Sequence, residues 1–221
     1  MNEYDLLDTA PLPDPELGFP WPPAESESIA TAFADTWRGA ALEPAAFFRA
    51  MPREAGIGPA LLYYLPLGIA VAGATLFWTL VGGGALGGGL LDGFGGPGAP
   101  ESNPLVDFLM SPLILLLSIF LSAGVSHLML KMLGGANRPV GTTVRVFAYA
   151  YSPQILGVIP WVGQLVGGLW MVVIAIIGLR EAHGTSGMRA AIAILVPLAF
   201  AVFFVILSLL ILATTTALMP L

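Results

Sequence analysis

Cysteine is absent from this chain of 221 residues, and charged residues make up only 10% of it, against 57% hydrophobic residues. The lack of cysteine excludes disulfides, thiolate nucleophiles and cysteine metal sites. A soluble domain carries roughly 25% charged residues, so the scarcity of charge excludes an ordinary water-soluble globule. The eight Lys and Arg residues are scattered singly, and we therefore expect no nucleic-acid partner.

The charge that is present is segregated. Ten of the 14 acidic residues lie within residues 1–54, which leaves only four acids and five bases for the rest of the chain. Residues 57–221 are therefore predicted to form a membrane domain. Residues 1–27 contain seven acids, no base and six prolines. Such a segment cannot bury enough apolar surface to offset its ordering entropy, so we expect a disordered acidic tail over 1–27.

Residues 28–56 are expected to form two short amphipathic helices. Ile29, Phe33 and Trp37 recur every four residues, and Pro44 is placed to start a second helix that carries Phe47. Aromatic residues beside arginine suit the membrane interface. Packing of these helices against the cytoplasmic ends of the spans accounts for the pattern equally well.

Five apolar segments are predicted to cross the membrane. A helix rises 1.5 Å per residue, so about 20 residues cross a hydrocarbon core of about 30 Å. Residues 146–179 are 34 residues without a charge, too long for one span, and Pro153 and Pro160 interrupt them. We therefore expect a hairpin of two spans there. The expected spans are 59–81, 105–133, 142–158, 161–179 and 190–212.

The basic residues test this topology independently, because cytoplasmic segments carry an excess of Lys and Arg. If 146–179 were one span, Arg180 and Arg189 would lie outside. With five spans, a cytoplasmic N-terminus and the C-terminus outside, all eight bases lie on cytoplasmic segments. They are Arg38, Arg49, Arg53, Lys131, Arg138, Arg145, Arg180 and Arg189. The predicted fold class is an all-α membrane protein with five transmembrane helices.

Small residues mark the candidate packing surfaces. Ser118, Ser122 and Ser126 are spaced by four and lie on one face of the second span. Gly163 and Gly167 form a GxxxG step in the fourth span, where small residues let helices approach closely. Helix packing is favoured over a polar substrate path. We expect the serine face inside the bundle and the glycine step on a homo-oligomer surface.

Polar groups beside Pro153 form a second candidate site, made of Tyr149, Tyr151, Ser152 and Gln154. A proline leaves a carbonyl of the preceding turn without its helical partner, and nearby hydroxyls can satisfy it. This structural role is the default interpretation, and a binding pocket at the kink is the alternative.

Basic groups near the cytoplasmic side form a third candidate site. His127 and Lys131 stand four residues apart and share a helix face. With Arg145 they are candidates for binding a lipid headgroup, although simple anchoring explains them as well.

Enzymatic chemistry is not predicted. The two histidines, His127 and His183, have no acid–base constellation or metal-ligand spacing around them, so no catalytic residue, metal or cofactor is expected. No Asp, Glu, Lys or Arg lies in the middle of an expected span, which argues against an ion-coupled transporter.

Several stretches resemble the Yip-domain family of membrane proteins, in their order and spacing more than in any single motif. The clearest runs from Arg145 to Pro153. The others are residues 41–44 with 47–48, 127–135, 159–163, 177–186, 189–190 and Pro197. The resemblance covers about residues 40–200.

The resemblance implies five spans with a cytoplasmic N-terminus, and a non-enzymatic role in membrane organisation or trafficking. It also implies GTPase binding in eukaryotic members, but residues 1–27 contain no stretch that matches a GTPase-binding segment. The Gly-, Ala- and Pro-rich composition indicates a prokaryotic member, in the plasma membrane. The favoured hypothesis is a scaffold or adaptor with a membrane-protein partner or a homo-oligomeric state. The alternative is a small-solute permease or channel subunit.

Overall fold

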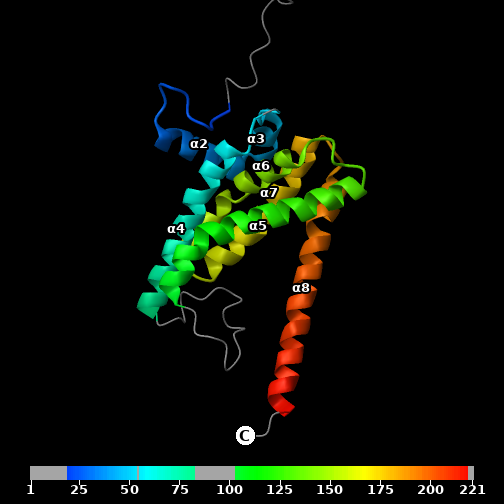
Figure 1. The fold of residues 1–221 in the computed structure, drawn as a ribbon. Helices are drawn as coiled ribbons and strands as arrows, with labels where there is room; N and C mark the ends of the chain where they lie inside the picture. Colours follow the sequence, from blue (N-terminus) through cyan, green and yellow to red (C-terminus); the bar gives the residue numbers. More distant parts are fainter. Residues whose placement is uncertain (1–18, 54, 83–102, 219–221) are drawn as a thin grey trace, which may run out of the picture.

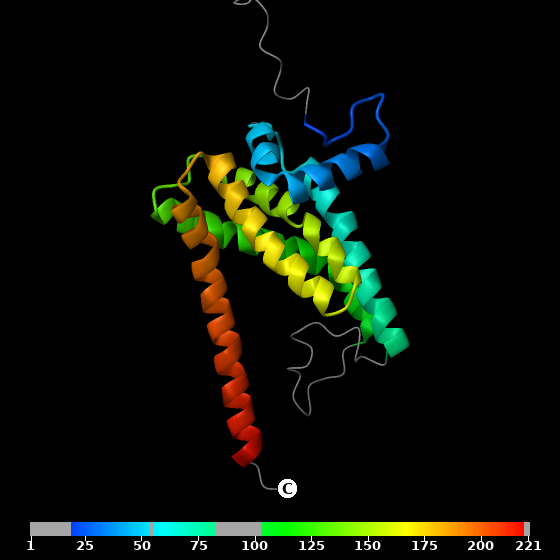
Figure 2. The ribbon, with the colours of Figure 1, turned by 180° about the vertical axis from the view of Figure 1, so that it is seen from behind.

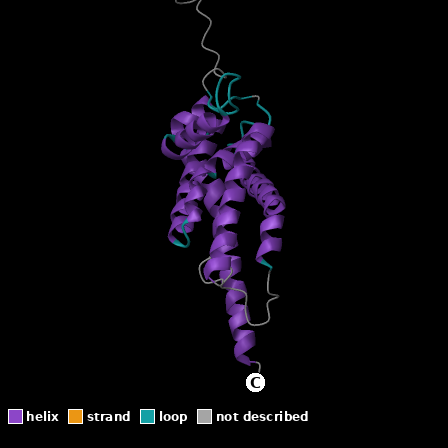
Figure 3. Cartoon of the chain, turned by 90° about the vertical axis from the view of Figure 1, so that its left-hand side faces the viewer, coloured by secondary structure: helices purple, strands orange, loops and turns teal. Residues whose placement is uncertain are grey.

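A computed structural model of the chain describes residues 19–53, 55–82 and 103–218. These parts form helices joined by loops, with no strand among them (Figure 3). The elements are α2 (Ile29–Leu42), α3 (Pro44–Ala50), α4 (Gly58–Gly82), α5 (Pro104–Met132), α6 (Val140–Ala150), the 3₁₀ helix η3 (Ser152–Val158), α7 (Val162–His183) and α8 (Gly187–Leu218).

Helix α7 lies at the centre and packs against α3, α6, η3 and α8. Helix α4 packs against α5 and η3, and α5 also contacts α6 and α8. Helices α2 and α3 lie across one end of this bundle, at the top of Figure 1. The later turns of α8 extend away from the other helices in both views (Figures 1 and 2).

Local chemistry sets where the helices begin and end. The Ser28 side chain accepts a hydrogen bond from the Thr31 N–H at 3.1 Å and starts α2. Pro44, the first residue of α3, needs no N–H partner there. Helix α7 ends at His183 and is capped by Gly184, whose φ of 59° is the left-handed conformation that glycine adopts without strain.

Four of the described helices are long and apolar enough to cross a membrane, namely α4, α5, α7 and α8. The expected third span, 142–158, is not one regular helix. Helix α6 ends at Ala150 and η3 continues it. Pro153 has no N–H for the Tyr149 carbonyl, and the Ser152 hydroxyl donates to that carbonyl instead, at 2.6 Å. The kink was predicted, but the change of helix type was not.

The prediction of a disordered tail over residues 1–27 is wrong for its last part. Residues 1–18 lie outside the described residues, but residues 19–27 pack on the bundle. Trp21 is only 8% exposed, and its Nε1 donates to the Pro59 carbonyl at 2.7 Å. The Phe19 ring lies 5.6 Å from the ring of Tyr149. The disorder prediction weighed charge and proline content but not these two aromatic rings, which bury a large apolar area.

Candidate functional site at the basic end of the bundle

One end of the bundle is formed by α2, α3, the C-terminal ends of α5 and α7, and the first turns of α6 and α8 (Figure 1). We call it the basic end, because contacts of the predicted cytoplasmic arginines tie it together. Arg49 of α3 pairs with Glu181 of α7 at 3.1 Å. Arg189 of α8 donates to the Gly134 carbonyl, just after α5, at 3.2 Å.

Arg145 of α6 is the most buried of these bases, at 3% exposure. Its guanidinium donates to the carbonyls of Pro52 and Arg53, the latter at 3.1 Å, and to Thr142 Oγ1 at 3.4 Å. The N–H groups of this planar guanidinium therefore hold the loop after α3 against α6. Its Nε atom is buried without a hydrogen-bond partner among the described residues.

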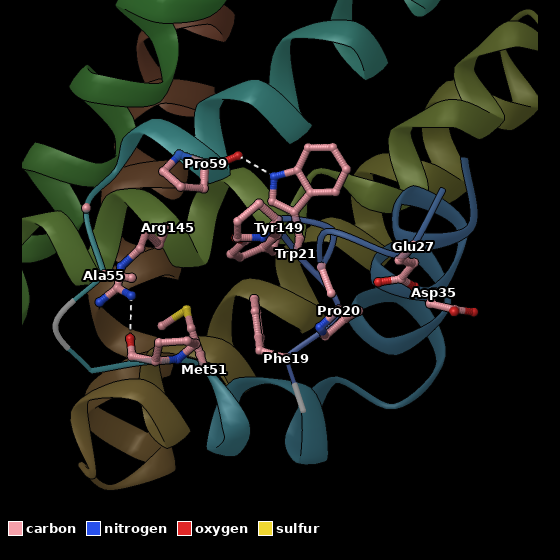
Figure 4. Close-up of a pocket in the computed structure, with 14 residues that line it drawn as sticks. Phe19, Pro20, Trp21, Glu27, Asp35, Met51, Ala55, Pro59, Arg145 and Tyr149 are labelled. Atoms are coloured by element: carbon pink, nitrogen blue, oxygen red, sulfur yellow. Dashed lines mark hydrogen bonds between the residues drawn. The ribbon is translucent and has the colours of Figure 1, made fainter. Parts of the chain in front are cut away.

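Two cavities meet at Arg145. The aromatic cavity, of about 740 Å³, is drawn in Figure 4 and is lined mainly by Phe19, Trp21, Met51, Pro59 and Tyr149, with Glu27 and Asp35 at its edge. The arginine cavity, of about 580 Å³, is lined by Arg49, Arg53, Arg138, Arg145, Glu181 and His183 among others. One guanidinium thus borders an apolar space and a strongly polar one.

A threonine hydroxyl joins three helices beside the arginine cavity. Thr143 Oγ1 lies 2.9 Å from His127 Nδ1 of α5 and 3.0 Å from His183 Nε2 of α7. A hydroxyl can donate one hydrogen bond and accept others, so it can serve both rings. The Asn137 amide also donates to the His183 carbonyl, at 3.0 Å. The sequence showed no constellation around either histidine, because these partners are far apart in the chain.

Among the polar kink candidates, Ser152 is the centre of the hydrogen bonds. The Tyr63 hydroxyl lies 2.7 Å from Ser152 Oγ, and Trp37 Nε1 donates to the Ser152 carbonyl at 2.9 Å. Gln154 Nε2 contacts Met171 Sδ at 3.6 Å. Tyr149 is buried and Tyr151 half-buried. These bonds hold α2, α4 and η3 together, which agrees with the structural interpretation of the kink.

The glycine step lies inside the chain's own hairpin instead of on a subunit surface. A Cβ at Gly163 would lie 1.8 Å from the Leu156 carbonyl oxygen, and one at Gly167 would lie 2.7 Å from the Pro153 oxygen. Both glycines are buried against η3. Close approach was predicted, but its partner is the neighbouring arm of the hairpin, because the short turn at Pro160 forces the two arms together.

The serine face is not buried as a unit. Ser126 is 5% exposed, whereas Ser118 and Ser122 are exposed. The Ser118 hydroxyl donates to the Leu115 carbonyl of its own helix at 2.9 Å and also interacts with the Tyr64 hydroxyl of α4. The expectation that the whole face packs inside the bundle therefore holds for Ser126 alone.

The expected headgroup candidates are not grouped together. Arg145 borders both cavities, whereas neither His127 nor Lys131 lines either of them. His127 is bonded to Thr143, and Lys131 is exposed. The spacing of four correctly placed two bases on one helix face, but it could not show which other elements surround them.

Three further arginines, Arg49, Arg53 and Arg138, were not predicted as site residues. They come from α3, the loop after it and the loop before α6, and they line one cavity with Arg145. The sequence predicts that all three lie on cytoplasmic segments, on one side of the membrane. Their convergence depends on the packing of α3 against α7, which no sequence pattern shows.

The chemistry that this arrangement supports is the binding of anions and of backbone carbonyls. The described residues contain no group of three or more His, Cys, Asp or Glu side chains that could hold a metal ion. The basic end therefore offers donors: guanidinium groups, an amide and imidazoles.

Comparison with known proteins found a family model that matches the chain. The family model of the Yip1 domain matches residues 38–210, from within α2 into α8. No curated protein and no solved structure matches the chain. The match spans most of the sequence and includes every helix that could cross a membrane except the last turns of α8. The chain is therefore a multi-pass integral membrane protein that belongs to the Yip1-domain family.

Proposed function

We propose that the protein is a non-enzymatic membrane scaffold or adaptor that acts in membrane organisation or trafficking, with its basic end as the partner-binding platform. The observation that carries this proposal is the way α2 and α3 are fastened to the bundle. Trp170 of α7 donates to the Ala41 carbonyl at 2.8 Å, and Trp37 of α2 donates to the Ser152 carbonyl at 2.9 Å. These bonds fasten α2, and the Arg49–Glu181 pair fastens α3, so the two helices form a firm surface outside the apolar spans.

The polar kink supports this proposal over a solute permease. The Ser152 hydroxyl is bonded to Tyr149 and Tyr63, and the Ser152 carbonyl is bonded to Trp37. These groups satisfy one another within the chain. A transport path needs polar groups that can exchange protein partners for solute, so this network favours structure over transport.

The proposed topology has five crossings, with the N-terminus in the cytoplasm and the C-terminus outside a prokaryotic plasma membrane. The ends of α5 and α7 lie at the same end of the bundle, since Asn137 bonds to His183 and Arg189 to Gly134. If α7 crosses the membrane, α6 and η3 must return over the same distance. Their 11 and seven residues reach about 30 Å at 1.5 and 2.0 Å per residue.

Cysteine labelling tests this topology without background, because the chain has no cysteine of its own. A cysteine at Asn137 should be protected from an impermeant reagent added to intact cells. One at Gly95, which lies outside the described residues, should react. The reverse pattern would overturn the orientation.

Site-specific photocrosslinking tests the adaptor role. A photoreactive residue at Asp35, exposed on α2, is compared with one at Val81, exposed at the far end of α4. We expect a discrete protein adduct from Asp35 only, and loss of that adduct together with loss of cellular function when nearby Arg38 is changed to Glu. A solute flux in proteoliposomes that is abolished by Tyr149→Phe with Gln154→Leu, in folded protein, would favour the permease instead.

A further inference from the structure

The arginine cavity carries more positive charge than its own carboxylate neutralises. Glu181 is the one acid among its lining residues, and Arg49 and Arg180 both pair with it. Within the described part of the chain, Arg53, Arg138 and Arg145 form no ion pair with a carboxylate. The guanidinium groups of Arg53 and Arg138 thus remain available for an anion at this cavity, whereas the terminal nitrogens of Arg145 already donate to Pro52, Arg53 and Thr142.

Two buried polar atoms of the lining residues also lack partners. Arg145 Nε and His183 Nδ1 have no hydrogen-bond partner in the described structure, and their residues are 3% and 2% exposed. His183 Nδ1 can donate when Nε2 accepts from the Thr143 hydroxyl. Unpaired buried groups of this kind are rare, and here both belong to residues that line the cavity.

The start of α6 adds donors of another kind. Pro139 and Thr142 line the cavity, and no side chain caps the first N–H groups of this 11-residue helix. Uncapped N–H groups and the positive end of the helix dipole favour an anion at this position. Cationic side chains and a helix start therefore border the same space.

We propose that the arginine cavity binds a phosphoryl group, supplied by the headgroup of an anionic phospholipid. Planar guanidinium groups match the oxygens of phosphate in pairs, and a volume of about 580 Å³ is within the usual range for small-ligand pockets. The cavity lies at the end of α7, whose 22 residues match the hydrocarbon thickness, so it lies at headgroup depth. The proposal is independent of the adaptor role.

The test uses the full chain purified in an uncharged detergent. Dioctanoyl phosphatidic acid, dioctanoyl phosphatidylcholine and inorganic phosphate are titrated separately, with binding followed by native mass spectrometry and by Tm. We expect phosphatidic acid to bind and raise Tm, and phosphatidylcholine, which carries no net charge, to do neither. The double variant Arg53→Gln/Arg138→Gln should bind phosphatidic acid at least about tenfold more weakly, as loss of charge-assisted hydrogen bonds requires.

The matched control is Arg38→Gln/Lys131→Gln, which removes the same charge from exposed positions outside the cavity. Its affinity should stay within about twofold of the unmodified protein. Equal weakening in both double variants would overturn the site. Binding of inorganic phosphate as tight as that of the lipid would overturn the lipid source. Neither double variant removes a side-chain hydrogen bond found in the described structure, since Arg53 contributes only its carbonyl to Arg145.

Discussion

The basic end of the bundle and the long final helix are stabilised in different ways. At the basic end, hydrogen bonds join residues far apart in sequence, such as Arg145 with the Arg53 carbonyl and Trp170 with the Ala41 carbonyl. In α8, only Ala190, Ala193 and Ile194 are buried among the residues with described side chains. Beyond them the large exposed side chains are apolar, and the exposed hydroxyls of Ser208 and Thr214 donate to carbonyls of their own helix.

This difference in how the two regions are stabilised follows from lipid being the solvent of the spans. In lipid, apolar side chains gain little by leaving the bilayer, so helix association depends on close packing and on polar contacts. Those contacts gather at the basic end and at the kink of the α6–η3 segment. Helix α8 needs neither, because its own hydrogen bonds satisfy its backbone in the hydrocarbon. Substitutions should therefore lower the stability of the protein most at the hairpin and the basic end, and least in the exposed part of α8.

The largest effect is expected at the tightest contact. In Gly163→Ala, the new Cβ would meet the Leu156 carbonyl oxygen at 1.8 Å, and backbone cannot yield as a flexible side chain does. We expect a loss of about 3 kcal/mol or more, seen as a large fall in Tm in detergent. Gly168→Ala is the control, because nothing lies within 4 Å of its Cβ position. If the two variants melted alike, the hairpin contact would be wrong.

Arg145→Met should have the next largest effect. The substitution keeps an unbranched side chain but leaves the carbonyls of Pro52 and Arg53 without their donors. We expect a loss of about 2–3 kcal/mol, since several charge-assisted bonds are lost while the burial of a charge is relieved. Arg38→Met, on the exposed side of α2, should change Tm little. Limited proteolysis should also become faster near Pro52 in the Arg145 variant.

Ser152→Ala should have a smaller effect. The Tyr149 carbonyl and the Tyr63 hydroxyl both lose a partner within the bundle. We expect a loss of about 1–2 kcal/mol, measured as a shift in Tm. Ser208→Ala in α8 is the control, because that hydroxyl is exposed and donates to the Phe204 carbonyl of its own helix at 2.8 Å. A neutral Ser152 variant would show that the kink does not depend on its hydroxyl.

Much of the fold could be predicted because a helix that lies in lipid needs a long apolar run, and such runs are visible in the sequence. The apolar runs located the bounds of α4 and α5 to within one residue. Helix α7 extends four residues beyond the predicted end of its span, and α8 extends beyond its predicted span at both ends. Pro153 located the kink. The pairing of Ser152 with the freed Tyr149 carbonyl repeats in α5, where Ser111 donates to the Phe108 carbonyl before Pro112, at 2.7 Å. A serine before an interior proline is therefore informative in itself.

The site could be predicted only in part, because it depends on contacts between distant segments. Nothing local to Thr143 shows that two histidines from other helices reach its hydroxyl. Nor does a charge count show that Arg145 is buried while Lys131 is exposed. Charge asymmetry predicts on which side of the membrane the bases lie, and packing then decides which of them converge.

The smallest effect is expected in the exposed part of α8, where the comparison can be made within one helix. Phe204 is 59% exposed and Ile194 is 7% exposed. In lipid, Phe204→Ala removes side-chain contacts that are made with lipid both before and after bundle assembly, so we expect a change below about 0.5 kcal/mol. Ile194→Ala removes packing within the bundle and should cost about 2 kcal/mol or more. Thermal unfolding in lipid nanodiscs measures both, and detergent would blur the difference by altering the solvent around α8. If Phe204→Ala proved as costly as Ile194→Ala, that part of α8 would have to be packed against protein in the membrane, and the contrast with the basic end would fail.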